Sequence, residues 1–158
     1  MMRHRSALHV LTLAAAVTIA GCLGDSPVAP TIENATFATS LGIDLDDFTR
    51  LGSGLYYRDI VVGPGAQATV GTPVSVRYSG SLTNGFVFDS GGASRTPVDF
   101  TVGEGGLIAG FEEGTFGMRV GGTRQIIIPP HLGYGSQPRP GIPANSILVF
   151  TLELLSAD

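Results

Sequence analysis

The chain has 158 residues, one cysteine, no lysine and a formal net charge of −4 at pH 7. This acidic balance, without any basic run, argues against a nucleic-acid partner. A single cysteine cannot form a disulfide within the chain. Two of the three histidines, His4 and His9, lie in the first ten residues, so a His/Cys metal site is not expected either.

Residues 1–21 have the features of a secretory signal peptide. Two arginines precede an apolar run over residues 7–20, which is shorter than the roughly 20 residues that a comfortable membrane span needs. The run ends in the tetrapeptide IAGC at residues 19–22, which resembles the lipobox of bacterial lipoproteins. We therefore expect cleavage before Cys22 and lipidation of its thiol. The alternative is an ordinary signal, after which Cys22 has no special role. Without the signal, seven arginines stand against 13 acidic residues, a formal charge of −6.

Residues 22–52 are rich in Ser, Pro, Ala, Thr and Gly and carry scattered acids. Such a composition buries little apolar surface, so it predicts a flexible tether from the lipidated cysteine to the folded domain. Its few concentrated hydrophobic residues either dock on the domain or form a short helical turn; they are Leu41, Ile43, Leu45 and Phe48. The tether shows no long helical dimerisation arm, so we expect a monomer. Leu23, rather than aspartate, follows Cys22, which favours anchoring to a bacterial outer membrane, facing the periplasm.

Residues 53–158 have the pattern of one compact domain, with strands separated by Gly and Pro. Apolar residues alternate with period two over residues 72–82, which predicts a strand with one buried face. The Asn84-Gly85 pair then predicts a hairpin into a short strand at 86–88. Further strands are predicted at 55–62, 98–102, 124–128 and 147–155.

Residues 108–118 are the one segment with apolar residues at helical spacing. Gly110 and Gly114 each weaken a helix by roughly 1 kcal/mol relative to alanine, so we expect a short helix held by tertiary contacts. Glu112 and Glu113 are expected on its solvated face. The whole pattern predicts an α+β domain in which five or six mostly antiparallel strands surround one short helix.

Four clusters in this domain follow one another at compatible distances: VRYSG at 76–80, FVFDSG at 86–91, VGEGGLIAGFEEG at 102–114 and PPHLGYG at 129–135. Together with the strand ILVFTLELL at 147–155, they resemble the FKBP-type peptidyl-prolyl cis-trans isomerases, a family that also binds rapamycin-like macrolides. The resemblance covers residues 53–156. It implies a strongly twisted antiparallel half-barrel wrapped around one short helix, with the substrate cleft between them.

The resemblance implies catalytic roles for five residues: Tyr78, Phe88, Asp89, Phe111 and Tyr134. It implies substrate-binding roles for five more: Phe100, Leu107, Ile108, Ile142 and Phe150. In the family, the backbone N–H at the position of Ile108 binds a ligand carbonyl, and the Tyr134 hydroxyl would bind a substrate carbonyl. Two positions depart from the family pattern: Phe111 stands where tryptophan is frequent, and Val98 where an aromatic residue is common.

Rotation about an X–Pro bond cleaves no bond, so this chemistry needs no nucleophile, metal or cofactor. Its barrier of roughly 20 kcal/mol arises because amide resonance is lost at the twisted midpoint. A dry aromatic cleft binds the proline ring and removes the water that favours the planar amide. We therefore expect an isomerase that acts on proline-containing polypeptides of the envelope or of secreted proteins. Asp89 would supply a local field rather than exchange protons.

The residues alone leave other interpretations open. Asp89 could cap a turn with Ser90, while Tyr78, Phe100 and Phe150 could be ordinary core residues. The cleft could also belong to a non-catalytic module that binds proline-containing segments, which the aliphatic Val98 would favour. A structural surface lipoprotein that shares the strand pattern is a further possibility.

Overall fold

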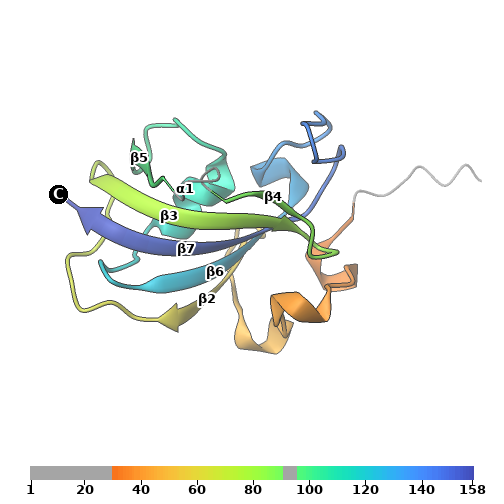
Figure 1. Ribbon diagram of the computed structural model, residues 1–158, viewed down its shortest axis with the longest axis horizontal. Coiled ribbons are helices and arrows are strands. Elements are labelled where there is room, and N and C mark those ends of the chain that lie inside the picture. Colours follow the sequence, from red (N-terminus) through yellow and green to blue (C-terminus); the bar gives the residue numbers. More distant parts are fainter. Residues whose placement is uncertain (1–29, 91–95) are drawn as a thin grey trace, which may run out of the picture.

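The computed structural model describes residues 30–90 and 96–158, so the predicted signal peptide and Cys22 lie outside the described residues (Figure 1). Within them, seven strands form one antiparallel sheet in the order β1-β2-β6-β7-β3-β4, and β5 pairs with the first half of β3. The strands are β1 (Thr49–Arg50), β2 (Tyr56–Val61), β3 (Pro73–Leu82), β4 (Val87–Asp89), β5 (Val98–Thr101), β6 (Thr123–Ile128) and β7 (Leu148–Ala157). The helical elements are α1 (Ala109–Thr115) and four 3₁₀ turns: η1 (Ile32–Asn34), η2 (Thr39–Leu41), η3 (Leu45–Asp47) and η4 (Pro130–Leu132). No helix in the described ranges is long and apolar enough to cross a bilayer.

The predicted α+β class, an antiparallel sheet with one short helix, is confirmed, and every predicted strand lies within two residues of its expected limits. The longest pairing joins β3 to β7 and runs from Val74 opposite Ala157 to Leu82 opposite Leu148. β1 has only two residues, too few to show a period in the sequence.

Helix α1 lies unusually close to the sheet because two of its residues have no side chain. A Cβ atom at Gly110 would stand 2.4 Å from a methyl group of Ile128, and one at Gly114 would stand 2.7 Å from a methyl group of Ile126. Both distances are far shorter than any van der Waals contact. The glycines that weaken the helix by propensity are therefore the residues that let it pack.

A buried arginine fixes the C-terminal end of α1. The Arg124 guanidinium on β6 forms an ion pair with Asp59 on β2, with 2.7 Å between Nε and Oδ1. Its Nη1 donates hydrogen bonds to the carbonyl oxygens of Gly114 at 3.0 Å and Phe116 at 2.9 Å. These carbonyls belong to the last turn of the helix, which has no intrahelical donor for them. Arg124 thus ties the helix end to two strands, and its guanidinium lies 4.5 Å from the ring centroid of Tyr57.

From Pro30 onward, the segment predicted to be a flexible tether is instead folded onto the domain (orange in Figure 1). The sequence left open whether the hydrophobic residues of this segment dock on the domain or form a helical turn, and the structure shows both. Leu41 and Leu45 lie in 3₁₀ turns. All four residues pack on a second buried cluster: Leu41, Ile43, Leu45 and Phe48. The buried members of this cluster are Ile32, Tyr56, Ile127, Ile147 and Val149. The folded unit therefore begins before residue 53, the limit expected from the sequence.

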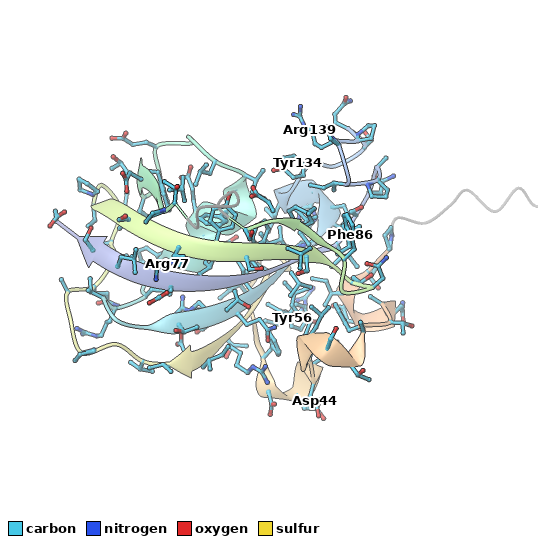
Figure 2. All side chains as sticks on the ribbon, viewed as in Figure 1. Asp44, Tyr56, Arg77, Phe86, Tyr134 and Arg139 are labelled. Atoms are coloured by element: carbon cyan, nitrogen blue, oxygen red, sulfur yellow. The ribbon has the colours of Figure 1, made fainter. Side chains whose placement is uncertain are left out.

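The second cluster lies on the face of the sheet opposite α1. In β6, Ile126 and Ile128 belong to the core beneath the helix, whereas Ile127 between them belongs to the second cluster. Successive side chains of a strand point to opposite faces, so three consecutive isoleucines indicate that both faces are covered. Polar contacts support the packing: the Tyr56 hydroxyl donates to Glu33 at 2.8 Å, and the Gln125 amide donates to the Leu41 carbonyl at 3.0 Å. Figure 2 labels Tyr56.

We predict that Ile32→Ala lowers the free energy of unfolding by about 2–5 kcal/mol, because Ile32 is buried in the second cluster and its removal leaves a cavity. Denaturant unfolding of the purified protein measures the change. The matched control is Ile60→Ala, which removes the same atoms from an exposed position on β2. Equal, small effects of the two substitutions would mean that residues 30–52 behave as a tether in solution.

Candidate functional site

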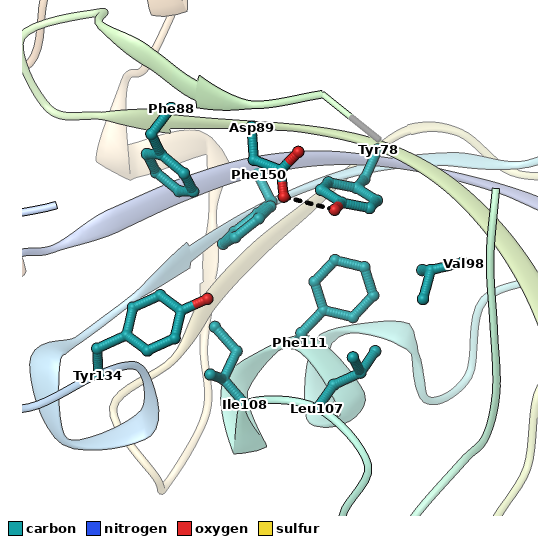
Figure 3. A pocket seen from close by; sticks show the side chains of 9 residues that line it. All are labelled: Tyr78, Phe88, Asp89, Val98, Leu107, Ile108, Phe111, Tyr134 and Phe150. Atoms are coloured by element: carbon teal, nitrogen blue, oxygen red, sulfur yellow. Dashed lines mark hydrogen bonds between the residues drawn. The ribbon is translucent and has the colours of Figure 1, made fainter. Parts of the chain in front are cut away.

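A cleft of about 80 Å³ lies between the sheet, α1 and the loop that follows η4. Nine residues line it, and Figure 3 shows their side chains: Tyr78, Phe88, Asp89, Val98, Leu107, Ile108, Phe111, Tyr134 and Phe150. All five residues predicted to be catalytic are among them, with three of the five predicted to bind substrate. Phe100 and Ile142 are not.

The walls of the cleft are aromatic rings that hold one another in place. Phe111, buried in the first turn of α1, packs edge to face with Tyr78 and with Phe150, each at 5.4 Å between ring centroids. Phe88 packs edge to face with Phe150 at 5.6 Å. This arrangement is the one that the charge distribution of aromatic rings favours. The rings from β3, β4, β7 and α1 therefore form a preorganised apolar surface.

The two predicted residues that miss the cleft support it from behind. The Phe100 ring packs on the ring of Phe111 at 5.8 Å. Ile142 is buried in the main core, and its backbone exchanges two hydrogen bonds with Arg139, of 2.8 Å and 2.9 Å. It thereby anchors the loop of residues 136–145. Both were predicted to bind substrate; they do not line the cleft, and their contact with substrate stays a prediction.

Gly80 of β3 is required by the position of the rings, although it does not line the cleft. A Cβ atom there would stand 2.6 Å from the Phe150 ring and 2.8 Å from the Phe88 ring. Any side chain at this position would push one of the two rings out of place. A glycine inside an alternating strand is a sequence signal for such close approach, and the alternation of residues 72–82 contains it.

Asp89, whose partner could not be predicted, contacts Tyr78. The Tyr78 hydroxyl donates a hydrogen bond of 2.7 Å to Oδ2 of Asp89 (Figure 3). This contact joins β3 to the end of β4 across one side of the cleft. The carboxylate therefore acts here as a hydrogen-bond acceptor that orients a ring hydroxyl.

Tyr134 closes the opposite side of the cleft, with its hydroxyl directed toward the space between the rings (Figure 3). The backbone turns sharply after it, because the Gly135 N–H donates to the Pro130 carbonyl at 2.8 Å and Gly135 has a φ of 56°. The Arg139 guanidinium lies 5.5 Å from the centre of the Tyr134 ring (Figure 2). This stacking restricts the ring from its outer side.

Glu112 is not on a solvated helix face, as the sequence analysis expected; it is 7% exposed. Its carboxylate accepts hydrogen bonds from the backbone N–H groups of Gly103, Gly105 and Leu107, at 3.0–3.2 Å. Glu112 therefore holds the loop that carries Leu107 and Ile108 into the cleft. Sequence periodicity could not reveal this, because the donors lie on a loop and not on another element.

Burial alone would raise the pKa of Glu112, but the backbone N–H groups of the loop outweigh it and hold that pKa below its ordinary value. An acid whose pKa is lowered by folding stabilises the folded state above the ordinary pKa of about 4.3, and this contribution is lost as pH falls below that value toward the folded pKa.

We therefore predict that Glu112→Gln destabilises the protein most near neutral pH. The difference in free energy of unfolding between the parent protein and the variant should shrink as pH is lowered from about 7 to about 3. Denaturant titrations at several pH values measure this difference. Glu113→Gln, on the neighbouring residue that accepts one hydrogen bond from the Ser53 hydroxyl, is the control. A difference that does not vary with pH would contradict the assigned role of the carboxylate.

Comparison with known proteins places residues 65–155 in the family described as FKBP-type peptidyl-prolyl cis-trans isomerase. Two similar curated proteins are fungal. FK506-binding protein 3 of Candida albicans is 51% identical over 108 residues, which are 68% of this chain and 25% of that protein. FK506-binding protein 4 of Chaetomium thermophilum is 50% identical over 106 residues, which are 67% of this chain and 22% of that protein. The matched region thus spans about a quarter of these curated relatives.

Two crystal structures resemble the present fold. AtFKBP13 superposes with a TM-score of 0.65 at 36% identity, covering 70% of this chain and 98% of that one. FkpA from Escherichia coli also gives a TM-score of 0.65 at 36% identity, covering 71% of this chain and 52% of that one. The first of these matches extends over nearly all of the chain in that crystal structure.

Proposed function

This chain belongs to the FKBP-type peptidyl-prolyl cis-trans isomerase family, and we propose that it accelerates the cis-trans rotation of X–Pro bonds in proline-containing polypeptides. The observation that carries the proposal is the cleft: apolar rings that fix one another edge to face, with the Tyr134 hydroxyl directed among them (Figure 3). Family membership alone would leave open whether this chain keeps a functional cleft.

The cleft suits a reaction in which a bond rotates and none breaks. The planar amide is dipolar, and water stabilises it; the twisted midpoint has lost amide resonance and this dipole with it. A dry apolar cleft removes that water, and so disfavours the planar forms relative to the twisted one. Every 1.4 kcal/mol of such preference increases the rate about tenfold.

The positions of the lining residues support a separate role for each of them in the proposed isomerisation. Phe111 forms the floor on which a proline ring rests, with Phe88 and Phe150 at its sides. The Tyr134 hydroxyl and the backbone N–H at Ile108, where α1 begins, donate to carbonyl oxygens on either side of the rotating bond. The Asp89 carboxylate accepts a hydrogen bond from the Tyr78 hydroxyl and so keeps the Tyr78 ring oriented. Asp89 neither gains nor loses a proton during the rotation.

The volume of the cleft limits the size of the chemical group that it can enclose. About 80 Å³ is well below the roughly 300–1,000 Å³ of sites that enclose drug-sized ligands, so only a small ring enters it. A proline side chain meets this limit. A rapamycin-like macrolide would insert one ring-sized part and leave the rest over the rim. Several relatives are named FK506-binding proteins, which supports macrolide binding by this chain as part of the proposal.

We predict that Tyr134→Phe lowers kcat/KM for isomerisation of a short proline peptide about fivefold to tenfold, the cost of one lost hydrogen bond to the substrate. A protease-coupled peptide assay measures it. Tyr57→Phe removes a hydroxyl from β2, away from the cleft, and should leave the rate unchanged. If the parent protein shows no activity on such peptides while folded, the isomerase proposal is wrong.

A non-catalytic module that binds proline-containing segments is the second candidate. The aliphatic Val98 in the cleft wall favours it, because the family commonly has an aromatic side chain at that position. The same assay with an added macrolide separates the candidates. An isomerase is inhibited as the macrolide fills the cleft, whereas a binding module takes up the macrolide and shows no rate to inhibit.

We further propose that the domain is lipid-anchored through Cys22 at a bacterial cell envelope, where its clients are envelope or secreted proteins. The support is the sequence of residues 1–22: two arginines, an apolar run and the tetrapeptide before the cysteine. Seven residues, 23–29, lie between Cys22 and the first described residue, Pro30.

We expect the full chain, made in a Gram-negative bacterium supplied with labelled fatty acid, to carry the label and to fractionate with membranes. Cys22→Ser should abolish the label, because it removes the thiol that receives the lipid. Gly21→Ala keeps a small residue before the cysteine and should retain the label. An unlabelled parent protein in the soluble fraction would overturn the anchoring proposal and leave the isomerase proposal untouched.

A further inference from the structure

A second apolar hollow adjoins the cleft. It has a volume of about 460 Å³ and lies between the loop that precedes β3, the loop of residues 103–107 and the outer side of α1. Its apolar lining includes Val70, Leu107, Ala109 and Phe116. We call it the outer groove. Leu107 lines both the cleft and the outer groove, so the two hollows adjoin at this residue.

The apolar residues of the outer groove are unusually accessible. Val70 is 74% exposed and Phe116 is 51% exposed, although each belongs to a residue type that is usually buried. Single exposed hydrophobic residues are common on protein surfaces, but here they face the same hollow. Gly103 lies beside Val70, and a Cβ atom at this position would stand 3.3 Å from the Val70 side chain. Because Gly103 has no side chain, it does not fill this part of the groove. The groove therefore remains open.

The two charged residues that line the groove, Glu112 and Glu113, each accept hydrogen bonds from other parts of the protein. The Glu112 carboxylate accepts hydrogen bonds from three backbone N–H groups of the loop. The Glu113 carboxylate accepts a hydrogen bond of 2.8 Å from the Ser53 hydroxyl. The rest of the lining is apolar or glycine. The chemistry of its lining therefore selects an apolar occupant.

We propose that the outer groove binds an apolar side chain of the same polypeptide whose proline occupies the cleft. This inference rests on the proposed function and extends it from one proline to a segment of the client. The shared residue Leu107 is the reason for choosing the client itself as the occupant: a chain that leaves the cleft over this residue reaches the groove next. The groove is also large enough for a bulky side chain, with a volume in the range typical of ligand sites.

The substrate class that follows is an unfolded segment with a large apolar residue a short distance from proline. Partial burial of one such side chain should increase kcat/KM about tenfold over a short peptide that ends beside the proline. A folded protein that exposes a proline in a polar loop would not gain from the groove.

The test compares a four-residue proline peptide with longer peptides that carry leucine or, as the matched control, serine in the added residues. Extensions on the N-terminal and the C-terminal side are tested separately. We expect the leucine extension on one side to raise kcat/KM about tenfold and the serine extensions to raise it little. Val70→Ser should remove most of the gain without changing the rate on the short peptide.

The control variant is Val62→Ser, which removes the same groups from a position that is 71% exposed and lines neither hollow. It should retain the whole gain. Phe116→Ser provides a second variant at the groove. In parallel, NMR titration of the parent protein with the leucine-extended peptide should shift the resonances of Val70 and Phe116, which follows binding even without catalysis.

The outcomes separate this inference from the proposed function. No activity on the short peptide contradicts the isomerase, and the NMR titration then decides on the groove. Activity on the short peptide with no gain from leucine, or a gain that Val70→Ser leaves intact, overturns the groove proposal alone. Resonances of Val70 and Phe116 that respond to protein concentration and not to peptide would show a contact between copies instead, and would equally overturn it.

Discussion

The close contact between α1 and the sheet is the constraint on which the cleft depends. Phe111 reaches the rings of Tyr78 and Phe150 only because Gly110 and Gly114 let the helix lie directly on Ile128 and Ile126. Arg124 fixes the other end of the helix against the sheet, through hydrogen bonds to the carbonyls of the last helical turn. A helix displaced outward by one methyl group would separate the rings and admit water to the floor of the cleft.

The same packing explains why the site divides into a narrow cleft and a broader groove. Glu112 holds the loop of residues 103–107 in place through hydrogen bonds, and Leu107 of this loop lines both hollows. In our proposal, the cleft binds one ring and favours the twisted amide, whereas the outer groove adds only contact area. In such an arrangement, a client can be chosen by its flanking residues while the rate enhancement arises at the proline alone.

Local patterns in the sequence predicted the strands, the hairpin and the short helix, because their residues alternate or recur along one face. The cluster motifs also brought most of the lining residues together. Phe100 and Ile142 came from the same motifs but do not line the cleft, since a motif gives a residue's neighbourhood and not the direction of its side chain. Composition suggested a tether where residues 30–52 cover the outer face, although the isoleucine run of β6 already indicated two buried faces.

Exchange NMR on a peptide with a single X–Pro bond tests the central claim, since it needs no coupled protease. A small amount of the protein should bring the cis and trans resonances, which interconvert over tens of seconds unaided, into measurable exchange, and a macrolide should abolish that exchange. Resonances of Phe111 and Tyr134 that shift on peptide addition while cis and trans interconvert no faster would contradict the claim that the ring-lined cleft favours the twisted bond.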